Sequence, residues 1–235
     1  MDAPGQSGGS GVIQKLWIPA VHLRNAAAVL FLLGCAVGLV LLTQLPSQLV
    51  TQRLLWLGLV GALAAASYSG WPFHYKYFGL GEPIVFLLSG PLVTAGAAAM
   101  YFPGSWELAR FGLLSLPLAF LVTLRLHSGN MQRIPFDTIA GVHTIARLGG
   151  FTWSKRSYAF LVGAPFVTVV LLVLFGPAPR FALLALASLP VAAWTLIPLS
   201  SARGPLDPAC AELKSRASVL HVAFGIFYAI GFLFS

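Results

Sequence analysis

Seven long apolar segments follow one another along the chain, separated by shorter polar connections. With the residues that flank it, each segment provides the roughly 20 helical residues that cross the hydrocarbon core of a bilayer. A membrane-spanning sheet would alternate polar and apolar positions, and these segments do not alternate. The pattern predicts an all-α, polytopic membrane bundle with seven transmembrane helices, over residues 25–43, 54–70, 83–102, 108–126, 158–176, 181–199 and 217–234.

The composition favours the same class of fold. Hydrophobic residues make up 58% of the 235 residues and charged residues only 9%, and the mean hydropathy is +0.86. A soluble domain of this length carries far more charge, so the composition excludes one. Apart from a Gly- and Ser-rich start, no repeat or linker divides the chain, so we expect a single membrane domain over residues 1–235.

Lysine and arginine are divided unevenly between the two sets of alternate connections. One set holds 11 of these residues and the other holds three, Arg53, Arg110 and Arg180, which accounts for all 14. Because cytoplasmic loops carry the excess of positive charge, we expect the first set and the N-terminus to be cytoplasmic and the C-terminus to lie outside. The same distribution explains the net charge of +8 without a run of cations, so we expect no nucleic-acid partner.

Three longer connections lie on the predicted cytoplasmic face, at residues 71–82, 127–157 and 200–215. Long connections in a compact protein are often functional. The middle connection is the longest, and apolar residues interrupt its polar ones, which predicts short helices at the membrane surface. We therefore expect the chemistry of the protein on this face.

The first of these connections carries a recognisable motif. Residues 68–82 read YSGWPFHYKYFGLGE. This segment resembles the signature loop of the UbiA superfamily of intramembrane prenyltransferases, in particular the 1,4-dihydroxy-2-naphthoate polyprenyltransferases of menaquinone synthesis. The resemblance continues over residues 83–90, 130–146 and 217–231, and residues 2–14 resemble the stretch after the family's first aspartate-rich motif. It covers essentially the whole chain.

The resemblance implies both a fold and an activity. Family members have nine membrane helices around a central cavity that opens sideways to lipid. Mg²⁺ ions held by two aspartate-rich motifs bind a polyprenyl diphosphate there, and an aromatic acceptor takes the prenyl group. Divalent cations neutralise the leaving diphosphate as the allylic bond breaks. The resemblance thus implies an integral protein of a bacterial cytoplasmic membrane that uses Mg²⁺ when active, with the bilayer, an isoprenoid diphosphate or other isoprenoid lipid, and an aromatic acceptor as partners.

The chain departs from the family pattern in three places. The first aspartate motif is missing together with the first two helices, so that seven spans remain of nine, and only Asp2 matches a trailing aspartate. The second motif should place two carboxylates four residues apart on one helical face, where both reach the same ions. Here the earlier position is Arg133 and the later one is Asp137. Val142-His143 stands where the family commonly has Lys-Arg.

Arg133 has two interpretations that the sequence leaves open. A guanidinium does not ligate Mg²⁺ and repels a cation placed beside Asp137, so the family's two-ion arrangement is not expected. Arginine is a good bidentate partner for phosphate and would hold an anionic head group directly. Alternatively, Arg133 pairs with Asp137 at i, i+4 and only supports a helix.

The resemblance assigns diphosphate contacts to three further residues. For Tyr68 the alternative is an ordinary aromatic at the membrane interface, and for Lys76 it is a cation that extends to the interface. For Asn130 it is a routine turn residue. Glu82 is interpreted as structural, because a carboxylate at a helix start favours the helix dipole. We thus expect a diphosphate to bind Tyr68, Lys76, Asn130 and Arg133 and a metal to bind Asp137, and we assign no catalytic residue.

Two functions follow from these features. In the first, the protein transfers a polyprenyl group from its diphosphate to an aromatic, naphthoate-like acceptor. In the second, it is an inactive relative that keeps the lipid-accessible cavity and binds a quinone, isoprenoid or other lipid as a membrane subunit or carrier. A transporter is disfavoured, because the sequence lacks repeat halves and paired broken helices.

Overall fold

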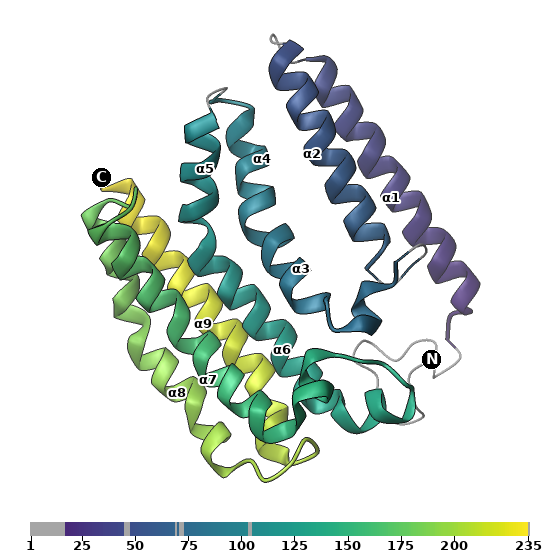
Figure 1. The fold of residues 1–235 in the computed structure, drawn as a ribbon, viewed down its shortest axis with the longest axis vertical. Coiled ribbons are helices and arrows are strands. Elements are labelled where there is room, and N and C mark those ends of the chain that lie inside the picture. Colours follow the sequence, from purple (N-terminus) through teal and green to yellow (C-terminus); the bar gives the residue numbers. More distant parts are fainter. Residues whose placement is uncertain (1–16, 45–47, 69, 71–72, 103–104, 235) are drawn as a thin grey trace.

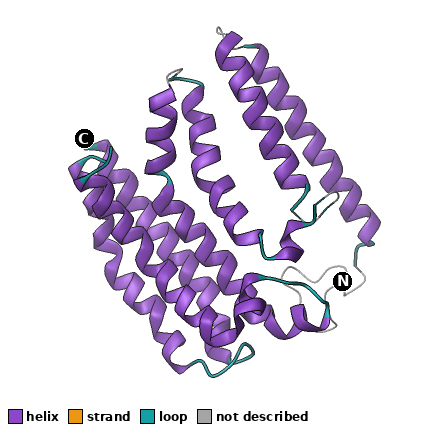
Figure 2. Cartoon of the chain, viewed as in Figure 1, coloured by secondary structure: helices purple, strands orange, loops and turns teal. Residues whose placement is uncertain are grey.

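The computed structural model describes residues 17–44, 48–68, 70, 73–102 and 105–234. Within these residues every regular element is a helix, as Figure 2 shows. The all-α prediction is therefore confirmed.

Most of the predicted apolar segments correspond to helices that can cross a membrane. Five are long and apolar enough by themselves: α1 (Ala20–Thr43), Gly81–Ala99, α7 (Ile145–Leu174), Arg180–Ser201 and α9 (Pro208–Leu233). Two of the five are composite. Gly81–Ala99 contains α3 (Gly81–Leu87), η2 (Leu88–Leu92) and α4 (Val93–Ala99), and Arg180–Ser201 contains η3 (Arg180–Ser188) and α8 (Leu189–Ser201).

The two remaining segments are less regular. A sixth span is a bent pair, α5 (Ser105–Leu114) and α6 (Leu116–Ile139), with an angle of 43° between the two helices. In the last segment, α2 (Gln48–Ala66), the apolar stretch is Val50–Ala66. This stretch is shorter than the roughly 20 residues that cross a bilayer core. A polytopic membrane bundle is thus confirmed, and the number of seven spans stays a prediction.

The helices form three groups (Figure 1). The antiparallel pair α1 and α2 stands at one edge, α3 to α5 lie in the middle, and α6 to α9 form a bundle at the other edge. The buried core lies in this bundle and includes Leu121, Tyr158 and Phe224. The Tyr158 hydroxyl donates to the Leu213 carbonyl at 3.0 Å, which ties α7 to α9. By contrast, α1 has no buried residue, as expected of an apolar helix whose surroundings are lipid.

The three long connections share one end of the molecule. The α2–α3, α6–α7 and α8–α9 connections all lie at the end where α1 begins, whereas α9 ends at the opposite end (Figure 1). In the first connection the short helix η1 (Tyr75–Phe78) lies between His74 and Gly79, which both have positive φ, at 48° and 76°. The structure thus groups the predicted cytoplasmic connections at one end.

The middle connection differs from the prediction. Residues 127–157 were expected to form a loop with short surface helices, but α6 continues to Ile139 and α7 begins at Ile145. Residues 140–144 separate the two helices, and a further break at Gly150, where φ is 74°, leaves a short helical piece at residues 145–149, as the prediction of short helices expected. Helix α6 continues through this polar stretch because its polar side chains bond to groups on a neighbouring helix and on α6 itself. Polar groups satisfied in this way do not need the solvent contact of a loop.

Candidate functional site

The first half of the site is the α2–α3 connection. The backbone N–H of Lys76 donates to the carbonyl of Tyr68 at 3.0 Å, so the chain folds back on itself. The rings of Tyr68 and Tyr75 meet edge to face with 5.7 Å between their centroids. The ammonium of Lys76 lies 5.8 Å from the centroid of the Tyr77 ring. The loop therefore presents a cation beside a cluster of tyrosines.

The second half of the site is the end of α6. The Arg133 Nε lies 3.6 Å from Asp137 Oδ1, so the predicted i, i+4 ion pair is present. The other carboxylate oxygen of Asp137 accepts a hydrogen bond from the Thr144 hydroxyl at 3.1 Å. Thr144 also caps the N-terminus of α7 by accepting from the Arg147 N–H. Asp137 thus links the end of α6 to the start of α7.

The two halves lie against each other. Lys76 and Arg133 are both close enough to Asp137 to act on its carboxylate electrostatically. Burial and then the Glu82 carboxylate raise the pKa of Tyr68, while Arg133 opposes them. The Tyr68 hydroxyl therefore stays protonated, and a hydrogen-bond donor, at physiological pH. The fifth predicted residue, Asn130, donates from Nδ2 to Glu82 Oε1 at 3.0 Å. The structure thus brings all five predicted residues together.

Sequence reasoning missed three parts of this arrangement. Glu82 was interpreted as a helix-start carboxylate, and it does lie in the first turn of α3, but it also accepts hydrogen bonds from α6. His127, which carried no assignment, is fully buried against Glu82. Tyr75 was also missed, and its buried hydroxyl has no hydrogen-bond partner among the described residues.

The described residues contain no preformed cluster of metal ligands. They contain no group of three or more His, Cys, Asp or Glu side chains placed to hold a metal ion. The candidate ligand, Asp137, already interacts with Arg133 and Thr144, and no second carboxylate stands beside it where Arg133 lies. The match to the first aspartate motif, Asp2 within residues 2–14, lies outside the described residues.

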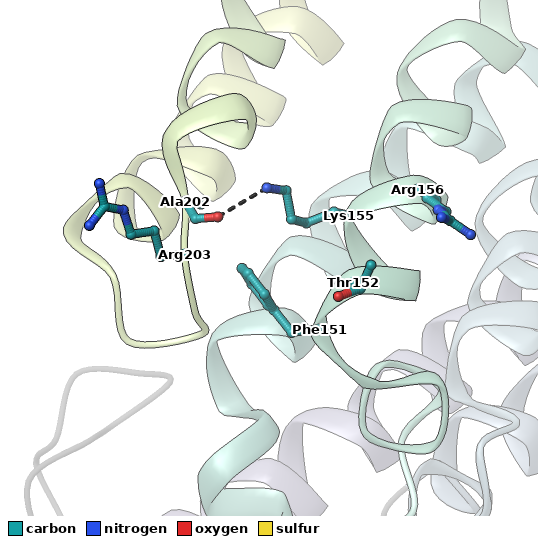
Figure 3. Close-up of a pocket in the computed structure, with 6 residues that line it drawn as sticks. All are labelled: Phe151, Thr152, Lys155, Arg156, Ala202 and Arg203. Atoms are coloured by element: carbon teal, nitrogen blue, oxygen red, sulfur yellow. Dashed lines mark hydrogen bonds between the residues drawn. The ribbon is translucent and has the colours of Figure 1, made fainter.

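A separate pocket lies between α7 and the α8–α9 connection (Figure 3). It encloses about 310 Å³, and its lining includes Phe151, Lys155, Arg156 and Arg203. Lys155 points across it and donates to the Ala202 carbonyl at 3.0 Å, while the two arginines lie on opposite sides. None of the five predicted residues lines this pocket. Its cations do not converge, so it is not the diphosphate site that the sequence predicted.

Comparison with known proteins identifies the family. Residues 17–219 match the UbiA prenyltransferase family. A human protein called UbiA prenyltransferase domain-containing protein 1 is 31% identical over 205 residues, which are 87% of this chain and 56% of the human protein. The Dictyostelium discoideum protein of the same name is 33% identical over 134 residues, 56% of this chain and 39% of its own.

A Drosophila melanogaster homolog of the same protein is 34% identical over 143 residues, which are 60% of this chain and 38% of the relative. The chain therefore spans between 38% and 56% of the length of these curated relatives. No solved structure matches the chain. Because the family match covers most of the chain, and includes both halves of the site, the protein belongs to the UbiA prenyltransferase family.

Proposed function

We propose that the protein binds a polyprenyl diphosphate at the cytoplasmic face of a bacterial membrane and transfers the prenyl group to an aromatic, naphthoate-like acceptor. The observation that carries this proposal is the meeting of Lys76, Arg133 and the Tyr68 hydroxyl at one end of the apolar bundle. Two cations and a neutral donor suit the oxygens of a diphosphate. The surrounding apolar helices suit a polyprenyl tail.

The two cations would bind the diphosphate in different ways. Lys76 is a compact charge on a flexible stem, whereas the guanidinium of Arg133 presents a planar fork that matches phosphate oxygens. Tyr68 would add a hydrogen bond from a hydroxyl that burial keeps neutral. Asn130 has one amide hydrogen engaged with Glu82, which leaves its second one for a phosphate oxygen.

A second function is favoured by the Arg133–Asp137 ion pair. Arg133 occupies the place of a metal-binding carboxylate, and its charge opposes a cation beside Asp137. A relative with such a site would retain the isoprenoid and lose its transfer, and would act as a lipid-binding subunit or carrier. In a Mg²⁺-dependent transfer the ion would need ligands besides Asp137, and diphosphate oxygens and water are ligands that Mg²⁺ commonly takes.

One experiment separates these functions. The full-length protein is purified in lipid nanodiscs and given geranylgeranyl diphosphate and 1,4-dihydroxy-2-naphthoate, with Mg²⁺ or with EDTA. Prenylated naphthoate that forms only with Mg²⁺ supports the enzyme, and binding of the diphosphate without product supports the inactive relative. Absence of both binding and turnover would rule out both. Lys76→Ala should weaken binding, whereas Arg110→Ala, which removes an exposed arginine from the predicted outer face, should not.

The substitution Arg133→Asp tests the role of the ion pair directly. It restores two carboxylates at i, i+4 on one face of α6, the spacing at which both can reach one ion. We expect diphosphate binding by this variant to become dependent on Mg²⁺. Binding that is the same as in the wild type, in both affinity and metal dependence, would show that Arg133 does not contact the ligand.

A further inference from the structure

The imidazole of His127 is buried between two hydrogen-bond acceptors. Its Nδ1 lies 3.0 Å from Glu82 Oε1 and its Nε2 lies 3.0 Å from the backbone carbonyl oxygen of Ser154. The exposed fraction is 0% for His127 and 7% for Glu82. A carbonyl oxygen only accepts hydrogen bonds, so Nε2 carries a hydrogen.

The environment of Glu82 decides the state of the other nitrogen. Glu82 Oε1 also accepts a hydrogen bond from Asn130 Nδ2 at 3.0 Å. Glu82 Oε1 therefore faces two nitrogens, and the amide nitrogen of Asn130 can only donate. An ionised carboxylate oxygen is well suited to this position, because it accepts hydrogen bonds from both nitrogens. A neutral His127 protonated at Nε2 would turn the lone pair of Nδ1 toward that carboxylate, which is repulsive. Hydrogens on both ring nitrogens would satisfy all of these contacts at once.

The groups around this pair are compatible with that charge state. The Tyr68 hydroxyl lies close enough to Glu82 to interact electrostatically, and its high pKa keeps it neutral. The ring of Trp153 meets the imidazole edge to face with 6.3 Å between centroids. Arg133 also acts electrostatically on the Tyr68 hydroxyl. An imidazolium at His127 would place a compensating charge in direct contact with a Glu82 carboxylate, as a buried ion requires.

The pair connects three helices at the site. Glu82 begins α3, directly after the loop that carries Lys76, and its partners His127 and Asn130 lie on α6. The third contact, from His127 to Ser154, reaches α7 beyond a kink at Gly150, where φ is 74°. The Ser154 hydroxyl donates to the Ala146 carbonyl across the same kink at 3.2 Å. The buried contact between Glu82 and His127 therefore joins the loop half of the site to the helix half.

We propose that Glu82 and His127 form a buried carboxylate–imidazolium pair that positions the Asn130 amide and the Lys76 loop for ligand binding. Both are positioning residues, since neither is assigned a contact with the ligand. The charge state of the pair is independent of the proposed function, while its effect on ligand binding rests on that function. A buried pair of this kind contributes little net stability and mainly fixes geometry.

The charge state is tested by nitrogen NMR of the full-length protein labelled with ¹⁵N-histidine in nanodiscs. At about pH 8 an exposed histidine is mostly neutral, with one protonated nitrogen. We expect His127 to keep both nitrogens protonated at that pH, and to become singly protonated in Glu82→Gln. The signal is assigned with His127→Gln or, if that variant does not fold, by elimination with Gln at the other four histidines: His22, His74, His143 and His221. A singly protonated His127 in the wild type would overturn the proposal.

The positioning role is tested by affinity for geranylgeranyl diphosphate. Glu82→Gln should weaken binding about tenfold, the size of effect expected when a hydrogen bond to a charged group is lost. Glu212→Gln removes an exposed carboxylate on α9 and should leave affinity unchanged. Equal affinity of wild type and Glu82→Gln, with the NMR change present, would overturn the positioning role. If the wild type binds no diphosphate, the proposed function fails, and with it the ligand-positioning role, while the NMR result still decides the charge state.

Discussion

The hydroxyl of Tyr75 is a buried donor without a partner among the described residues. Its side chain is only 6% exposed, and burial raises its pKa, so the hydroxyl stays protonated. An unsatisfied buried polar group costs about 1–3 kcal/mol. We therefore expect Tyr75→Phe to unfold at the same temperature as the wild type or slightly higher, measured by thermal unfolding in detergent.

The same substitution should weaken binding of a diphosphate if Tyr75 donates to it. The matched control is Tyr101→Phe, which removes a hydroxyl from a side chain that is 78% exposed and should change neither stability nor affinity. A clear loss of stability in Tyr75→Phe would contradict the prediction, because it would mean that the hydroxyl has a partner.

At the scale of residues, local spacing was predictable and long-range partners were not. The Arg133–Asp137 pair follows from positions four apart on one helix, so the sequence contained it. The contacts of Glu82 with His127 and Asn130 join positions 45 and 48 residues apart, which no periodic pattern reports. The sequence therefore identified residues that lie at the site and missed the pair that holds its halves together.

Among the elements, the contact of η2 with α6 depends on a glycine. A Cβ added to Gly90 would lie 2.5 Å from the Cβ of Ala119, so the two helices approach too closely for any side chain at this position. We expect Gly90→Ala to destabilise the protein by about 1–3 kcal/mol, the usual cost of overpacking. Thermal or denaturant unfolding in a fixed detergent measures this change.

Gly96 provides the matched control for Gly90. It lies in the next helix, α4, and a Cβ there meets nothing within 4 Å. Gly96→Ala should be neutral or should stabilise by up to about 1 kcal/mol, since alanine favours a helix more than glycine does. Equal effects of the two substitutions would show that the close approach of η2 and α6 does not limit stability.

The start of α9 should make stability depend on pH in the acid range. Asp207 caps this helix by accepting from the Ala209 N–H at 2.9 Å, and it also accepts from the Arg203 N–H at 3.0 Å. These two hydrogen bonds lower the pKa of the carboxyl. Its contribution to stability is therefore present above the carboxyl's unfolded-state pKa and is lost as pH falls through the lower folded-state value.

The variant Asp207→Asn separates capping from charge. Asparagine also caps helices but does not titrate, so its unfolding temperature should fall less on acidification than that of the wild type. Asp207→Ala should lose the cap at every pH and be less stable than the wild type at neutral pH. Identical pH profiles for wild type and Asp207→Asn would contradict the role given to the carboxylate.

At this scale the sequence predicted the helices better than their ends. Apolar segments report where helices lie, because lipid leaves no other way to satisfy the backbone. They do not report that α6 continues to Ile139, since its polar residues are satisfied by partners on other helices and on α6 itself. They also miss the bend of 43° between α5 and α6 and the kink at Gly150. These features depend on packing.

For the whole molecule, the number of spans decides whether the two termini lie on the same side of the membrane. An odd number places them on opposite sides. Within the described part of the chain, five helices are long and apolar enough to span a membrane. The bent pair of α5 and α6 would make six, and α2 would be the seventh. The start of α1 and the end of α9 lie at opposite ends of the molecule (Figure 1), as an odd number requires. Positive charge predicts that the end with the start of α1 is cytoplasmic.

Reporter fusions in a bacterial host measure this parity. Alkaline phosphatase fused after Ser235 should be active, because it folds only outside the cytoplasm, and green fluorescent protein at the same place should be dark. Fusions after Leu206, in the α8–α9 connection, should give the opposite result. Bright fluorescence at Ser235 with an inactive phosphatase would mean six spans or an inverted chain. Fluorescence of a fusion placed before Met1 would then identify six spans, because an inverted chain would start outside. The first candidate for a segment that fails to cross is α2, because its apolar stretch is the shortest tested.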